Sequence, residues 1–141
     1  MPSKPVVLFD INVVLDVLQR REPFYDHSAA LLGLAEMGQV KGFISSHSVT
    51  TLFYLLRKSL GPSSARAVIT NLLQILKVAA VDQGTIDQAL NLDYSDFEDA
   101  VQMICAVQLN ADCLVTRNVK DYQPALLPVL KPVEFLAVLG Q

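Results

Sequence analysis

Cysteine and histidine are scarce in this sequence, and their scarcity argues against several kinds of site. The two cysteines, Cys105 and Cys113, stand in apolar patterns, one typical of a helix and one typical of a strand. We therefore expect buried free thiols in a reducing cytoplasm rather than a disulfide. The two histidines, His27 and His47, are far from either cysteine in the sequence, which disfavours a zinc site.

Long apolar runs and several catalytic motifs are also missing. No run approaches the roughly 18 residues that a membrane-spanning helix needs. The opening MPSKPVVLFD has neither the apolar core nor the cleavage site of a signal peptide. No basic residue has P-loop spacing and no serine stands in a nucleophile elbow, which disfavours triphosphate binding and serine hydrolysis. We expect a cytoplasmic protein that does not bind membranes.

The composition is typical of one globular domain. The chain has 141 residues, of which 52% are hydrophobic and 18% are charged, so it is long enough for one core and too apolar to be disordered. We see no repeat, low-complexity segment or linker, and expect a single domain over residues 1–141. The net charge of −3 argues mildly against a nucleic-acid binder, although carboxylates that hold divalent cations would account for it.

Short apolar segments alternate with helical patterns along the chain. The segments expected to form strands are residues 5–9, 40–45, 78–81, 113–115 and 129–131. The helical patterns between them include residues 24–38, 65–76 and 82–92, and a last helix begins at Pro132. This alternation predicts a three-layer α/β/α sandwich with a central parallel sheet and right-handed crossovers.

Acidic residues follow the expected strands at positions that could meet. Asp10 ends the first strand, and residues 116–118 end the fourth, with Asp121 just beyond. Ligands of such sheets bind beyond the carboxyl ends of the strands, so neighbouring first and fourth strands would face one crevice. Asp96 and Asp99 begin the helix that leads into the fourth strand, and we expect that helix to start at the same edge.

The acids at the start of that helix can be partly separated by helix chemistry. Ser95 and Glu98 have the spacing of a capping box, which assigns Glu98 a structural role. Asp96 lies in the first turn, where the helix dipole favours an acid by about 0.3–1 kcal/mol. Neither effect explains Asp99, which is therefore the strongest site candidate of the three. Clustered carboxylates are suited to Mg²⁺ or Mn²⁺, ions that can activate water against a phosphodiester.

Other polar residues near these edges have two possible roles each. Asn12 is expected to cap the first helix and could also bond an acid of the site. Thr116 could orient a carboxylate or a water through its hydroxyl, while Arg117 and Lys120 could hold a phosphate backbone. Asp16, one turn along the first helix, is expected to face solvent.

Three stretches of the sequence together resemble the PIN-domain family. VVLFDINVVLD (residues 6–16) resembles its opening, residues 99–122 resemble its third block with a TRNxxDF-like turn, and residues 25–58 resemble the middle of VapC-type toxins. The resemblance implies an α/β/α fold and a metal-dependent endoribonuclease that uses Mg²⁺ or Mn²⁺ on RNA. It places the first acid at Asp10, the third at Asp99 and the fourth position at Asn118, with Asp121 three residues beyond. It also implies a possible antitoxin partner and a homodimer.

One departure from the family pattern leaves the activity open. The second acid, usually a glutamate, falls in residues 49–52, where this chain has Thr50 and Thr51 and no acid anywhere from 40 to 60. Either the chain is a nuclease that works with fewer carboxylates, with Asp96 or Asp16 as compensating acids, or it is a catalytically weakened module that binds RNA or protein. For the nuclease, the catalytic candidates are Asp10, Asp99 and Asp121, the metal ligands Asp10, Asp99, Asp96 and Asn118, and the substrate-binding residues Thr116, Arg117, Asn12 and Lys120.

A third reading is a phosphatase of the haloacid-dehalogenase type, because FDINVVLD faintly resembles the opening of that family. That family needs a second aspartate two residues after the first, and Asn12 stands there instead.

Overall fold

Five short parallel strands form the central sheet of the computed structural model, which describes residues 3–140. The strands are β1 (Val6–Phe9), β2 (Lys41–Ser45), β3 (Lys77–Ala79), β4 (Cys113–Val115) and β5 (Val129–Leu130), in the spatial order β3-β2-β1-β4-β5. All four neighbouring pairs are parallel. The expected parallel sheet is confirmed, and the first and fourth strands are neighbours at its centre.

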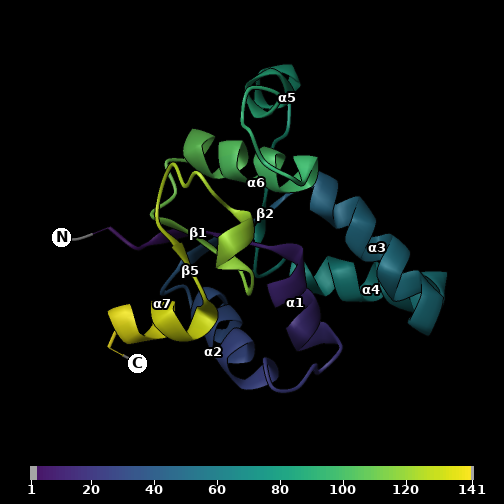
Figure 1. Ribbon diagram of the computed structural model, residues 1–141. Coiled ribbons are helices and arrows are strands. Elements are labelled where there is room, and N and C mark those ends of the chain that lie inside the picture. The colour runs from purple at the N-terminus through teal and green to yellow at the C-terminus, as the bar shows by residue number, and fades with distance from the viewer. Residues whose placement is uncertain (1–2, 141) are drawn as a thin grey trace.

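Burial on both faces of the sheet produces the three layers (Figure 1). Successive strand residues point to opposite faces, so Val7 and Phe9 of β1 belong to one core cluster and Leu8 to another. The first cluster includes side chains from α1 (Ile11–Leu18), α2 (Tyr25–Glu36), α3 (Ser46–Leu60), α4 (Pro62–Leu72) and α7 (Pro132–Val138). The second includes side chains of α6 (Phe97–Gln108), on which α5 (Gln83–Ala89) packs. The α/β/α architecture is therefore as predicted.

Helix boundaries differ from the expected ones where two nearby residues could both cap the helix. The N-cap of α1 is Asp10, so the prediction of Asn12 as its cap was wrong, and Asn12 is the second residue of the helix. The helices α3 and α4 are separated by Gly61, whose φ of 83° suits a residue without Cβ, and Pro62 then occupies the first turn of α4. A short 3₁₀ turn, η1 (Val119–Asp121), follows β4.

Two expectations about the whole chain can be compared with the structure. Cys105 and Cys113 are buried free thiols, as predicted. Within residues 3–140, no helix has both the length and the apolar character that crossing a membrane would require.

Candidate functional site

Asp10 lies where β1 meets β4, at the carboxyl edge of the sheet. Its backbone N–H donates to the Val115 carbonyl at 3.0 Å, which continues the β1–β4 pairing by one residue. The Thr116 hydroxyl donates to Asp10 Oδ2 at 2.8 Å, and the Asp10 side chain is almost fully buried. Burial raises the pKa of Asp10, while the hydrogen bond from Thr116 lowers it. Thr116 therefore holds the Asp10 carboxylate in place from behind.

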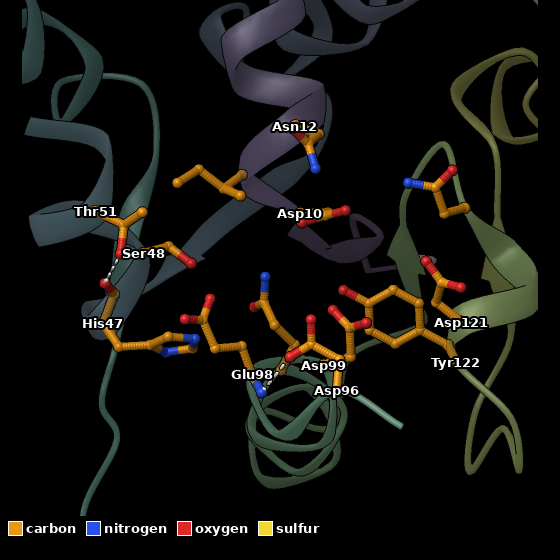
Figure 2. A pocket seen from close by; sticks show the side chains of 13 residues that line it. Asp10, Asn12, His47, Ser48, Thr51, Asp96, Glu98, Asp99, Asp121 and Tyr122 are labelled. Atoms are coloured by element: carbon orange, nitrogen blue, oxygen red, sulfur yellow. Dashed lines mark hydrogen bonds between the residues drawn. The ribbon is translucent and has the colours of Figure 1, made fainter. Parts of the chain in front are cut away.

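The acids at the start of α6 are arranged differently from the prediction. Asp96 is the N-cap, and its Oδ1 accepts the Glu98 N–H at 2.8 Å. The capping box of Ser95 and Glu98 was therefore wrong, because the last extended residue before the helix is Asp96 (φ −109°, ψ 120°) and not Ser95. This leaves the Glu98 side chain without a capping role. Asp99, one residue on, points toward Asp10 across the pocket (Figure 2).

These residues line a single pocket, in which Asp10 lies opposite the acids of α6 (Figure 2). Asp121 and Tyr122 lie at one side of it, and the first turns of α3 form the other side. The lining residues are Asp10, Ile11, Asn12, His47, Ser48, Thr51, Asp96, Glu98, Asp99, Gln102, Asn118, Asp121 and Tyr122. Five of these are carboxylates, and within the described part of the chain neither lysine nor arginine contributes to the lining.

Carboxylates outnumber the basic groups around this pocket: among residues 3–140, Lys120 lines an adjoining pocket with Asp96, Asp99 and Asp121, and Arg117 lowers the pKa of Asp10 from outside the lining. Burial raises the pKa of Asp99 to about 6, and the nearby carboxylate of Asp96 adds to this, followed by those of Asp10 and Asp121. Three buried polar atoms in the lining, the Tyr122 hydroxyl, His47 Nδ1 and Gln102 Oε1, have no hydrogen bond of good geometry among residues 3–140, although the Tyr122 hydroxyl is close enough to Asp99 to lower the pKa of that carboxyl. Buried charge and unpaired polar atoms are both costly, and a hydrated cation would relieve both.

The donor chemistry fits a hard divalent cation, although the side chains are not gathered into a ready-made cage. Among residues 3–140, no three His, Cys, Asp or Glu side chains are close enough together to hold a metal ion by themselves. Mg²⁺ and similar ions often take only one or two carboxylates and complete their coordination with water and substrate phosphate. The oxygen-rich pocket suits that kind of coordination better than an all-protein site.

Two predicted substrate-binding residues lie outside the pocket. Arg117 Nε is 2.9 Å from Asp16 Oδ2, and the guanidinium lies over the ring of Phe24, 4.2 Å from its centroid. Asp16 is fully buried, so the prediction that it faces solvent was wrong. The reason is its partner, since Arg117 comes from the loop after β4 and meets Asp16 on α1. Lys120 is exposed on η1 and does not line the pocket.

Several residues of the pocket were not identified from the sequence. His47 and Ser48 come from the first turn of α3, Gln102 lies three residues after Asp99 on the same face of α6, and Tyr122 follows Asp121 directly. Gln102 could have been found, because a glutamine three residues after a candidate acid stands out in the apolar run of that helix. His47 and Ser48 carry no comparable signal.

The family model of the PIN domain matches residues 6–120. The chain belongs to the PIN-domain family. The prediction from the sequence is thereby confirmed, and the reading as a haloacid-dehalogenase-type phosphatase was wrong. No curated protein sequence matches the chain.

Solved structures with the same fold include chains of toxin–antitoxin complexes. A chain of a toxin–antitoxin complex from Klebsiella pneumoniae is similar with a TM-score of 0.68 and 20% identity, covering 89% of this PIN-domain chain and 97% of the other. VapBC2 from Rickettsia felis, bound to a DNA fragment from its promoter, is similar with a TM-score of 0.64 and 19% identity. The match covers 89% of this chain and 97% of the other. VapC20 from Mycobacterium tuberculosis, described as a Sarcin-Ricin loop cleaving toxin, is similar with a TM-score of 0.60 and 15% identity. The match covers 77% of this chain and 86% of the other. At such low sequence identity, the structural similarity shows that the fold is shared and shows nothing further about this chain.

Proposed function

We propose that this PIN-domain protein, as a single domain over residues 1–141, is an endoribonuclease that hydrolyses RNA phosphodiesters with Mg²⁺ or Mn²⁺. The observation that carries the proposal is the pocket at the carboxyl edge of β1 and β4, lined by five carboxylates and by no lysine or arginine of the described residues. An acidic pocket of this kind repels a phosphodiester unless a cation is present. The description of VapC20 as a loop-cleaving toxin supports a nuclease on this fold.

Two overlapping sets of side chains have roles in this proposal, the catalytic acids and the metal ligands. Asp10, Asp99 and Asp121 are the proposed catalytic acids. The ligands are Asp10, Asp99, the carboxylate oxygen of Asp96 that does not cap α6, and the Asn118 amide oxygen. When bound, a divalent cation polarises the phosphodiester and activates water.

The neutral and basic residues near the pocket have supporting roles. The Thr116 hydroxyl fixes the Asp10 carboxylate and favours its charged form. Asn12 lines the pocket and its amide can donate to a phosphate oxygen, while exposed Lys120 can attract the RNA backbone from outside. Arg117, engaged by Asp16 through its Nε, positions the loop that carries Asn118, and its partly exposed guanidinium keeps the predicted role toward the RNA backbone.

We further infer that the protein acts in the cytoplasm as the toxin of a toxin–antitoxin pair, with a cognate antitoxin as partner and a homodimer as the working form. This inference is supported by the similar structures, which include VapBC and other toxin–antitoxin complexes. It concerns the partner and not the chemistry, so it can fail without affecting the nuclease proposal.

A second candidate function is a PIN-fold module that binds RNA or protein without cleaving. Thr51 and Asn118 stand in the pocket where the family pattern has acids, and no three acidic side chains of residues 3–140 form a ready-made metal cage. A weakened metal site of this kind would still present a polar pocket to a partner.

The deciding experiment is RNA cleavage over a Mn²⁺ titration. We expect cleavage by the wild-type protein and its loss in Asp10→Asn and in Asp99→Asn, with circular dichroism spectra unchanged. Asp87→Asn, an exposed acid on α5 outside the pocket, is the matched control and should cleave normally. RNA binding without cleavage at any Mn²⁺ concentration would favour the second candidate.

A further inference from the structure

The wall of the pocket formed by α3 has no carboxylate, and most of its polar groups are already bonded. The Thr51 hydroxyl donates to the His47 carbonyl at 3.3 Å, within its own helix. The Ser48 hydroxyl is bonded to that of Ser45 at 2.7 Å. His47 is the exception, since its Nδ1 is buried without a hydrogen-bond partner among residues 3–140.

Glu98 faces this wall from the opposite helix. Its side chain and the His47 ring extend toward each other between α6 and α3 (Figure 2). Burial lowers the pKa of His47, and the facing Glu98 carboxylate acts against that shift. Within the described residues no ion pair joins them. Neither side chain is therefore held by the other, and both line the pocket.

Gln102 gives an independent sign that a ligand belongs at this end of the pocket. It lies four residues after Glu98, hence on the same face of α6 and one turn further along. Its side chain is 3% exposed, lines the pocket, and has an Oε1 without a partner among residues 3–140. A buried amide oxygen without a partner is unfavourable, so an acceptor is available here to a bound ion or to its water.

We propose that Glu98 supplies from α6 the carboxylate that α3 lacks, and that His47 and Gln102 Oε1 are further donors to the same divalent ion. The inference rests on the proposed metal dependence and adds its ligands and its selectivity. Mg²⁺ takes oxygen ligands in a nearly ideal octahedron, whereas a transition ion accepts an imidazole nitrogen more readily. The site is therefore expected to prefer Mn²⁺ to Mg²⁺, and His47 is the residue responsible.

Calorimetric titration of the metal-free, full-length protein with Mn²⁺ and with Mg²⁺ tests the proposal without any activity assay. Glu98→Gln is expected to weaken Mn²⁺ binding by about tenfold or more, in the range typical of damage to a metal site. Glu36→Gln removes the same charge at the exposed end of α2, away from the pocket, and should bind like the wild type. His47→Asn should reduce the ratio of Mn²⁺ to Mg²⁺ affinity.

A rescue variant tests whether Glu98 replaces an acid of α3. Thr51 lines the same pocket from α3, so adding Thr51→Glu to Glu98→Gln should restore Mn²⁺ affinity. A double variant that binds no better than Glu98→Gln would overturn the replacement. Metal-free melting curves of each variant check that the fold is intact.

The failure of this inference can be distinguished from failure of the proposed function. If Asp10→Asn loses Mn²⁺ while Glu98→Gln binds like the wild type, the metal site stands and the role of Glu98 is refuted. If the wild-type protein binds neither ion, the metal-dependent function itself is refuted and this inference with it.

Discussion

Replacing Arg117 by methionine should destabilise the protein strongly, because it leaves the buried Asp16 carboxylate without its ion-pair partner. Asp16 is fully buried, its Oδ2 lies 2.9 Å from Arg117 Nε, and its Oδ1 has no partner among residues 3–140. Burial already raises the pKa of Asp16, and the Arg117 guanidinium is the main influence against it. Removing one partner of a buried ion pair typically costs about 3–5 kcal/mol, a large part of the roughly 5–15 kcal/mol that stabilises a domain.

Urea unfolding at pH 7 in metal-free buffer measures this cost. With an m-value of about 1–3 kcal/mol/M, a loss of about 4 kcal/mol corresponds to a midpoint lower by about 2 M. Asp16→Leu should cost less, because Arg117 is 23% exposed and can turn toward water. The double variant should have the same free energy of unfolding as Asp16→Leu alone, since without the Asp16 carboxylate the loss of Arg117 leaves no buried charge unpaired. Arg66→Met, at an exposed position on α4, is the control and should stay within about 0.5 kcal/mol of wild type.

Two outcomes would refute this reasoning. A loss below about 1 kcal/mol in Arg117→Met would place the pair among surface ion pairs of little consequence. Strict additivity of Asp16→Leu and Arg117→Met would show that the two side chains do not depend on each other. Either result would also remove the argument that Arg117 positions the loop carrying Asn118.

Three further predictions concern the pocket. Saturating Mn²⁺, at about 100 times its Kd, should stabilise the native state by about 2.7 kcal/mol, seen as a higher Tm; a shift no larger than that of Asp10→Asn would count against a metal site. In metal-free protein, the pKa of Asp99 is raised to about 6 from 3.8, so the native state binds more protons than the unfolded state between these values. Stability should therefore fall as pH rises from about 4 to 6, and Asp99→Asn should flatten that slope in melting curves. Thr51→Glu should strengthen Mn²⁺ binding measured by calorimetry, whereas Thr50→Glu, about 100° around the helix and exposed, should not; equal affinities in both variants would show that this turn of α3 does not serve the ion.

The parts of the fold that the sequence predicts well are those fixed by periodicity and chain geometry. Alternating strands and helices leave few alternatives to a parallel sheet with right-handed crossovers. Strand pairing then brings Asp10 and Thr116 to one edge, and the crossover brings Asp99 to the same pocket. These placements needed no knowledge of individual side-chain contacts.

Burial of Asp16 could not be predicted in the same way. Helical spacing puts Asp16 three residues after Val13, whose side chain is in the core, but an isolated acid is ordinarily solvated. What reverses that expectation is Arg117, brought to α1 by the pairing of β1 with β4. The same contact engages Arg117 through its Nε, so a single tertiary partnership accounts for the burial of Asp16 and for the place of Arg117 outside the pocket.

The start of α6 shows how a shift of one residue alters the chemistry of the site. Ser95 and Asp96 are both good N-caps, and the local sequence does not decide between them. With Ser95 as cap, Glu98 would be the residue that reaches back to the cap. With Asp96 as cap, Asp96 itself bonds the Glu98 N–H and the Glu98 side chain faces the pocket. The pocket therefore has five carboxylates even though α3 has none. With threonine at position 51, the carboxylates of the pocket come from the end of β1, the start of α6 and η1.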